Sequence, residues 1–526
     1  MAEAKNHEKL NSDFKRTCKI IFGEEVGELE EFEPYLSEVL FPFKTVASSV
    51  SGKKIIISSP YYIDGAKYVS QEEIGSLKFE PLNINEIKDI DSLLEAAGER
   101  AVYCGNKIFG KNINVSEVDN CTDCMNVFHS QDITNTKYAA YCSVGRNSDS
   151  IYGVSWFNKC SHLIRCVQCY VIGGFRSFES HCSSGISDSY YTLNCSNVTN
   201  CMFSFNLRSK NCCIGNLQLS KGRYEELKKK LVSEMAERLR RDKRLFSLPD
   251  IFLKSGALEE KEAILEEEEV PEFVKKEFAE VTKIVLGKEH ELSGPTAKWL
   301  GEKIVKIERV AGAADSPAYK VEMPILGKLP ASKMAPLKEA VESAGMQVIT
   351  IGPEEMPSLD EVAERIAKKA VCTMEVDEGH NQNNPKSVSR FDSVDTYSSA
   401  WATRAKHSAF NSLVTESEYV FGGYMRVLYS GFLINCHSVT NVKNCFETDS
   451  SYKSSGCFFC HNCENVMEGL FCFNGKGQRY AVCNQQVQPE EFRRVKKLLL
   501  DYINDELKRN GRLDIDVFSI GARKKN

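Results

Sequence analysis

The chain has 526 residues, with 67 lysines and arginines against 73 aspartates and glutamates, a net charge of -6 and a pI of about 6.0. This balance excludes a general attraction to nucleic acid or anionic lipid, although it leaves room for a local basic face. No apolar run is long enough for a spanning helix, and the start lacks the apolar core of a signal peptide. We therefore expect a cytoplasmic protein that is not membrane-bound.

Residues 1–112 are expected to form a small module that mixes helices and strands. The stretch 86–103, EIKDIDSLLEAAGERAVY, places apolar residues near positions i, i+3, i+4 and i+7, which is typical of an amphipathic helix. The run 53–59, KKIIISS, is typical of a strand. This pattern predicts an α+β module, and packing or dimerisation is its simplest role.

Residues 113–218 are rich in Cys, Ser, Asn, Tyr and Phe, and one short phrase returns in them, as in ITNTKY, IYGVSW and VTNCMF. Each phrase starts with an aliphatic residue, at Ile133, Ile151, Leu163, Ile186 and Val198. Short β segments with tight polar corners predict a parallel β-helix (β-solenoid), in which small residues fill a narrow interior. An antiparallel β-sandwich is the alternative, but the phrases lack the dipeptides that form hairpins.

Residues 219–255 are expected to begin with an amphipathic helix that covers the last coil of this block. Ser220 suits the start of the helix, and the pattern continues through KKKLVSEMAERLRR. The acidic stretch 256–270 that follows is expected to be a solvated linker.

The sequence then repeats itself, which predicts a tandem duplication of a unit of about 260 residues. Phe205 and Asn206 match Phe473 and Asn474 at a shift of 268, and the starts of the two copies agree at a shift of 264. The expected domains are 1–112, 113–218 and 219–255, then the linker 256–270, then 271–380, 381–486 and 487–526, in which Pro489 suits the start of the second capping helix.

Cysteine is unusually frequent, with 21 residues in a chain that has no export signal. In a reducing compartment we expect thiols, metal ligands or small buried residues rather than disulfides. Cys457, Cys460 and Cys463 have a spacing that could hold zinc. In the first copy the corresponding residues are Ser189, Thr192 and Cys195, so core packing is the favoured interpretation and a zinc site in the second β-helix is the alternative.

No spacing selects a catalytic group. Histidines that could assist a cysteine nucleophile are His129, His162, His181, His437 and His461, and most of them are expected at corners or on the surface. The carboxylates of the first Cys-rich block show no pairing typical of a glycosidase, and they are Asp119, Asp123, Asp132, Asp149, Glu179 and Asp188. We therefore assign no catalytic, cofactor-binding or metal-binding residue, and no cofactor.

The phrase FNLRSKNCCIGNLQLSKGRYEEL, after NCSNVTNCMFS, resembles a motif of uncharacterised Cys-rich β-helix repeat proteins of phages and uncultivated microbes. It covers residues 194–227, and the second copy departs from it with GKGQR at 475–479. The resemblance implies a repeat protein and no established activity, so it transfers no functional residue.

The sequence thus predicts a non-enzymatic structural protein, a pseudo-dimer that assembles with protein partners or with itself through the faces of its β-helices, in the cytoplasm or in a particle assembled there. Zinc binding is the first alternative. Nucleic-acid binding is the second, because the helix after residue 220 and the tail 521–526 are basic. We identify no small-molecule substrate.

Overall fold

The computed structural model describes residues 2–169, 173–256, 269–313 and 316–522. The class is α+β, as expected, with one 14-stranded sheet, one 12-stranded sheet and three two-stranded sheets. No helix in these described ranges is long and apolar enough to cross a membrane. Most of the expected acidic linker 256–270 lies outside the described residues.

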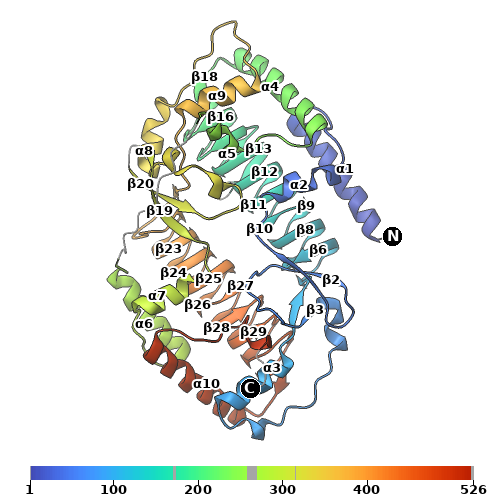
Figure 1. Cartoon of the computed structure of the whole chain (residues 1–526), viewed down its shortest axis with the longest axis vertical. Helices are drawn as coiled ribbons and strands as arrows, with labels where there is room; N and C mark the ends of the chain where they lie inside the picture. Colours follow the sequence, from blue (N-terminus) through green and yellow to red (C-terminus); the bar gives the residue numbers. More distant parts are fainter. Residues whose placement is uncertain (1, 170–172, 257–268, 314–315, 523–526) are drawn as a thin grey trace. The chain divides into compact units, whose positions relative to one another are not determined.

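The chain divides into two compact units, and neither is one continuous stretch of the chain. The first unit comprises Met1–Phe41, Phe109–Glu266 and Ile307–Asp377, and the second comprises Pro42–Ile108, Glu267–Lys306 and Glu378–Asn526. The modules expected over 1–112 and 271–380 are therefore each divided. Residues 42–108 belong to the unit with the 12-stranded sheet, and residues 307–377 belong to the unit with the 14-stranded sheet (Figure 1).

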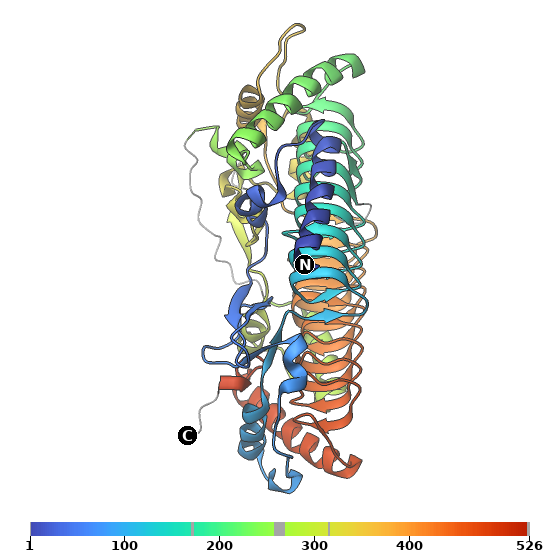
Figure 2. The ribbon, with the colours of Figure 1, turned by 90° about the vertical axis from the view of Figure 1, so that its right-hand side faces the viewer.

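The first unit is built around the 14-stranded sheet. Its helices are α1 (Ala2–Phe22), η1 (Leu29–Phe32), α2 (Glu33–Ser37), α4 (Lys221–Asp242), α5 (Leu248–Leu253), η5 (Leu326–Lys328), η6 (Ala331–Lys333), α8 (Leu337–Glu342), η7 (Ser343–Gly345) and α9 (Leu359–Lys369). Its strands are β5 (Ile108–Phe109), β6 (Ile113–Asp119), β7 (Cys121–Thr122), β8 (Met125–Thr134), β9 (Lys137–Ala140), β10 (Ser143–Arg146), β11 (Asp149–Asn158), β12 (Ser161–Cys169), β13 (Gly174–Ser183), β14 (Ile186–Ser187), β15 (Tyr190–Leu193), β16 (Thr199–Phe205), β17 (Asn211–Ile214), β18 (Leu217–Gln218), β19 (Ile307–Ala311) and β20 (Pro317–Val321). Helix α1 lies across successive strands of the large sheet, from β6 to β13 (Figure 2).

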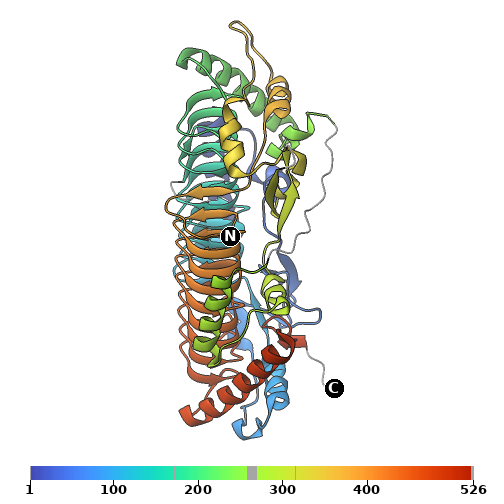
Figure 3. The same cartoon turned by 90° about the vertical axis from the view of Figure 1, so that its left-hand side faces the viewer.

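The second unit is built in the same way around the 12-stranded sheet. Its helices are α3 (Ile90–Arg100), α6 (Glu272–Leu286), α7 (Gly294–Gly301), α10 (Pro489–Asn510) and three short turns, η2 (Gln71–Ser76), η3 (Ile84–Glu86) and η8 (Ile520–Ala522). Its strands are β1 (Lys44–Ala47), β2 (Lys54–Ile57), β3 (Tyr68–Ser70), β4 (Tyr103–Gly105), β21 (Val376–Glu378), β22 (Ser389–Phe391), β23 (Val394–Thr403), β24 (Lys406–Thr415), β25 (Glu418–Leu428), β26 (Gly431–Ile434), β27 (His437–Thr440), β28 (Lys443–Asp449), β29 (Ser455–His461), β30 (Met467–Leu470), β31 (Arg479–Val482) and β32 (Gln485–Gln486). Helix α6 lies against these strands (Figure 3).

The strands of both large sheets are parallel, and most pair with the segment 12 residues further along the chain. In the first sheet Met125 faces Lys137, and in the second Thr448 faces Cys460. In the described parts of these two large sheets, only the last strand, β18 or β32, pairs antiparallel. The step is longer at β12–β13 and at β25–β26, which accommodate extra residues.

The backbone of these sheets repeats every three residues. From Asn114 to Gln168, and again from Tyr429 to Cys483, every third residue has a positive φ. Most residues that follow these left-handed positions are small or aliphatic and form the buried interior clusters, as Cys460 does after Phe459, and Phe157 is a larger exception. The three-residue spacing of the cysteines is therefore a property of the backbone.

A left-handed conformation costs a non-glycine residue roughly 1–2 kcal/mol. Because these sheets contain many such residues, other interactions must offset the cost. Asn tolerates this conformation best, and its side chain is short enough to hydrogen-bond locally. Here Asn114 Nδ2 donates to Asn126 Oδ1 at 3.0 Å, and Asn462 Nδ2 donates to Asn474 Oδ1 at 2.9 Å. These amide ladders join successive 12-residue steps.

Cysteine and serine fill the interior with the same hydrogen bonds. The Cys142 thiol donates to the carbonyl two residues before it at 3.3 Å and to the carbonyl nine residues after it at 3.5 Å. Ser454 Oγ has the same two acceptors, at 3.1 and 3.4 Å, and also accepts from the N–H of Val466 at 3.1 Å. Serine and cysteine can therefore occupy the same kind of interior position.

The helices expected after each Cys-rich block are present as α4 and α10. Ser220 Oγ accepts from the N–H of Arg223 at the start of α4, and Pro489 opens α10. Each helix ends at a left-handed residue, Lys243 or Gly511. Figure 2 shows α4 across the end of the first sheet.

We expect Ser454→Ala to lower the free energy of unfolding of the second unit by about 1–3 kcal/mol, because the buried N–H of Val466 loses its acceptor. Ser454→Cys should cost less, since a thiol can accept at such a position, as Cys460 Sγ does from the N–H of Cys472. Urea denaturation followed by circular dichroism compares the two variants. Equal losses would show that the hydrogen bond is not what the serine supplies.

Candidate functional site

The cysteines of the zinc hypothesis lie in the interior column of the second sheet. Cys457, Cys460 and Cys463 are fully buried, and each thiol donates to backbone carbonyls. Burial raises the pKa of the Cys460 thiol well above its usual range, which disfavours the thiolate that binds zinc. Among the described residues, the one group of three ligand atoms lying mutually within 4.8 Å contains none of these cysteines.

The first unit instead holds a buried ionic cluster around Glu179. Glu179 Oε1 accepts from Arg165 Nε at 2.6 Å, and Oε2 accepts from the N–H of Leu248 at 3.1 Å. The Arg165 guanidinium also lies 3.9 Å from the centre of the Tyr35 ring. Burial acts to raise the pKa of Glu179, but the charge of Arg165 and the hydrogen bond from His181 outweigh it and lower that pKa. The carboxylate is thus charged and ties the segment after α4 to the sheet.

His181 belongs to the same cluster and has both ring nitrogens in use. Its Nδ1 accepts from the N–H of Val167 at 3.1 Å, so the proton is on Nε2, which donates to Glu179 Oε2 at 3.0 Å. An imidazole held in this way has no lone pair left to act as a general base.

The second unit has a related cluster at the equivalent position, 268 residues further on. Glu447 Oε1 accepts from Asn435 Nδ2 at 3.0 Å, and Oε2 accepts from the N–H of Val517 at 3.1 Å. Lys303 supplies the nearby positive charge and pairs with Asp516 at 2.9 Å. Burial is the main cause that raises the pKa of Glu447 to about 7.

Beside Glu447, a buried Asp–His pair holds the segment that comes from the first copy. His461 Nδ1 donates to Asp449 Oδ2 at 2.8 Å, and its Nε2 accepts from the N–H of Cys104 at 2.8 Å. Tyr62 OH donates to the same Asp449 oxygen at 2.8 Å. Since Tyr62 and Cys104 belong to residues 42–108, this pair serves to dock that segment.

The expectation that the histidines lie at corners or on the surface is wrong for three of them, because His181, His437 and His461 are buried. The sheets are thickly covered by helices and exchanged segments, so outward-facing side chains are also inside the unit. His129 pairs with Glu117 at 2.8 Å. His129, His181 and His461 thus face carboxylates rather than cysteine thiols.

Apart from Glu179, acidic residues noted in the sequence make local contacts, as Asp188 and Asp123 show. Asp188 forms two 2.7 Å hydrogen bonds with Arg176, and Asp123 Oδ1 accepts from the N–H of Lys111 at 2.8 Å. These contacts are of the kind that fixes corners and ladders.

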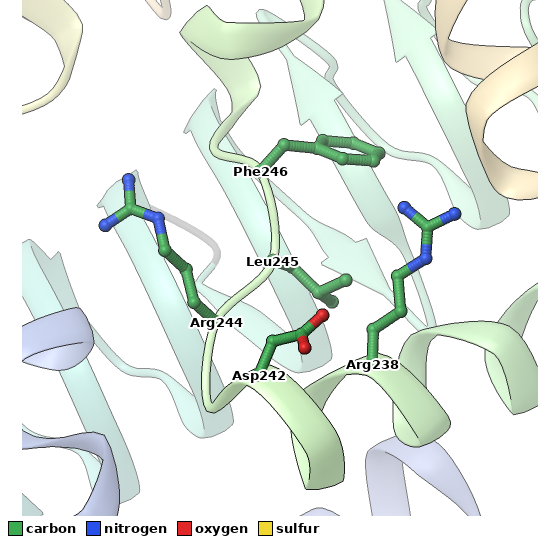
Figure 4. A pocket seen from close by; sticks show the side chains of 5 residues that line it. All are labelled: Arg238, Asp242, Arg244, Leu245 and Phe246. Atoms are coloured by element: carbon green, nitrogen blue, oxygen red, sulfur yellow. The ribbon is translucent and has the colours of Figure 1, made fainter.

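One surface hollow of about 280 Å³ lies at the end of α4 in the first unit (Figure 4). Arg238 and Arg244 extend on either side of Leu245 and Asp242. Each arginine is already paired, Arg238 with Asp360 and Arg244 with Glu38. The hollow therefore offers compensated charge rather than a strong anion site.

The three-ligand group in the described part of the chain is Glu277, Asp395 and His407. His407 Nδ1 lies 2.8 Å from Glu277 Oε1 and 3.5 Å from Asp395 Oδ2. Asp395 and His407 are left-handed residues 12 apart on β23 and β24, so their side chains stack, and α6 adds Glu277 from 130 residues away. The 12-residue step could have suggested the first pair, but nothing in the sequence points to Glu277.

No family model matches the sequence, and comparisons with curated proteins and with solved structures give no significant match. Function is therefore argued from the geometry of the chain itself.

The burial of His437 should make the stability of the second unit depend on pH. Neither of its ring nitrogens has a hydrogen-bond partner among the described residues. Burial and the charge of Lys303 lower its pKa to about 3, although Asp449 and Asp516 act to raise it. The folded pKa is thus below the unfolded value of about 6.5, so the stabilisation is complete above that pH and is lost, by up to about 1.4 kcal/mol per pH unit, as the pH falls toward 3.

We expect His437→Phe to lose less stability than the wild type between pH 7 and pH 5. Urea midpoints measured across this range test the difference. The carboxyl of Glu447, whose raised pKa makes its contribution decline as the pH rises through about 7, is present in both proteins and cancels in the comparison. Parallel curves for the two proteins would rule out the histidine as the cause.

Proposed function

We propose that this chain is a non-enzymatic structural protein, a pseudo-dimeric scaffold of two parallel β-helices that takes part in assembling a larger complex or particle. The parallel pairing at a 12-residue step and the left-handed residue at every third position support the β-helix. Each coil would have four corners, with small residues inside. The antiparallel final strand and the following helix would close one end of each β-helix.

A tandem duplication is supported by contacts that recur in both units. The buried carboxylate that accepts a backbone N–H after the capping helix is Glu179 in one unit and Glu447 in the other. Asn206 Nδ2 donates to Val371 O at 3.0 Å, and Asn474 Nδ2 donates to Val102 O at 2.8 Å. Asn206 of the first copy thus binds a segment of the second copy, and Asn474 of the second copy binds a segment of the first.

This reciprocal exchange suggests how the pseudo-dimer arose. Two separate chains that exchange equivalent segments form a closed pair, and fusing them preserves the exchange within one polypeptide. Divergence of the copies would then allow the two outer faces to bind different protein partners. All 21 cysteines are free thiols, which fits the proposed cytoplasmic setting.

The proposal rests on the hydrogen bonds that the buried ionisable groups make within the fold. Glu179, His181 and His461 have their polar atoms bound to backbone N–H groups or to neighbouring side chains. Asp449 Oδ2 accepts from both His461 and Tyr62. Such groups build and lock a fold, whereas a catalytic group keeps one atom facing the substrate.

A cleavage experiment tests the exchange. A protease recognition sequence placed between residues 256 and 270 allows the purified full chain to be cut into its two copies. We expect the fragments to elute together in size-exclusion chromatography and to separate only in denaturant, because each holds a segment of the other. The uncut variant is the control, and fragments that separate in native buffer would overturn the exchange.

The scaffold role is tested by the size of the native assembly. Native mass spectrometry of the chain isolated from its own cells should show a species heavier than the 59.1 kDa polypeptide. A strict monomer with no co-purifying protein would count against an assembly function even if the cleavage result holds.

A further inference from the structure

We propose that Glu277, Asp395 and His407 form a binding site for a divalent transition-metal ion in the second unit. The three residues come from α6, β23 and β24, and each offers one ligand atom within 4.8 Å of the other two. All three side chains are partly buried, so the ligands are held in place while solvent can still reach them.

The carboxylate of Glu277 has one oxygen that could still bind a ligand. Its Oε1 lies 2.8 Å from His407 Nδ1, but its Oε2 is buried and has no hydrogen-bond partner among the described residues. The carboxylate of Asp395 faces the same histidine, with its Oδ2 3.5 Å from His407 Nδ1, so negative charge gathers beside this acceptor. A buried acceptor surrounded by negative charge is stabilised by a bound cation.

The His407 ring is fixed in orientation. The Tyr419 ring stacks on it with centroids 4.9 Å apart and an interplanar angle of 25°. Asp395 is held as well, since its Oδ1 accepts from Asn383 Nδ2 at 2.7 Å, which leaves Oδ2 facing His407. Ligands that are held before binding lose little freedom when the metal arrives.

The first copy shows what the same place looks like without these ligands. Phe14 packs on Tyr152 there as Phe278 packs on Phe421 here, which sets the shift to 264 on the helix and 269 on the strands. The residues that correspond to Glu277, Asp395 and His407 are then Asp13, Asn126 and Tyr138.

In the first copy, both carboxylate oxygens of Asp13 have a partner. Asp13 accepts from Tyr152 OH at 2.9 Å and pairs with Arg16. In the second copy Phe421 has no hydroxyl, and Glu280 stands in place of the arginine. The shared fold therefore does not require the three ligands, and the second copy has lost the donors that would satisfy Glu277.

One imidazole nitrogen and two carboxylate oxygens are ligands of zinc, cobalt and manganese rather than of soft metals. Water molecules would complete the coordination. This site is separate from Cys457, Cys460 and Cys463.

The test uses the full chain, treated with chelator and titrated with Zn²⁺ in a calorimeter and with Co²⁺ by visible absorption. We expect one equivalent to bind and the Co²⁺ spectrum to change. His407→Phe, which keeps the stacking on Tyr419, and Asp395→Asn should each weaken binding at least tenfold, because each removes one of three protein ligands. Circular dichroism shows whether each variant is folded.

Two matched variants serve as controls. His129→Phe removes a histidine that faces a single carboxylate in the first unit, and Cys460→Ser removes a central interior thiol. Both should bind like the wild type. The proposal fails if the wild type shows no saturable binding, if folded His407→Phe and Asp395→Asn both bind normally, or if Cys460→Ser abolishes binding, which would return the site to the thiols.

Discussion

The left-handed residue at every third position is the constraint on which both large sheets depend. It turns the chain after each pair of extended residues and sends the next side chain inward, so that a strand can meet the segment 12 residues later. The interior is filled mainly by small or aliphatic side chains, and a polar side chain there must be small and must reach a backbone carbonyl. Serine and cysteine meet both conditions, and the high cysteine content follows from that geometry.

The outer faces of the sheets obey a different rule, because they carry charged groups that are nonetheless buried. Glu179, Glu447 and Asp449 lie there, and each binds a backbone N–H or a side chain of a covering segment. A buried charge without a partner is costly in free energy. Each covering segment must therefore bring to the sheet a group that binds the buried charge. Arg165 supplies positive charge beside Glu179, and Lys303 supplies it beside Glu447. The two cations come from different positions in the two units.

The sequence predicts the parts that are local or periodic. The three-residue spacing, the two capping helices and the match between copies can all be read from residues close together or related by one shift. The exchange of segments cannot, because the residues 86–103 have the same helical pattern whichever sheet they cover. His461 shows the difficulty, since its partner Asp449 is 12 residues away but its contact with Cys104 spans 357 residues. Glu277 is likewise brought to His407 only by the packing of α6.

The exchange also dictates an order of events during synthesis. Residues 42–108 leave the ribosome early, yet the strands that carry Asp449 and His461 are made more than 300 residues later. At about 5–20 residues per second this delay is on the order of tens of seconds. Throughout that interval the apolar face of the early segment, which includes Ile55 and Ile57, has no native surface to cover it. The arrangement that locks the finished protein thus leaves the nascent chain dependent on protection from aggregation, by a chaperone or by transient contacts within the first copy.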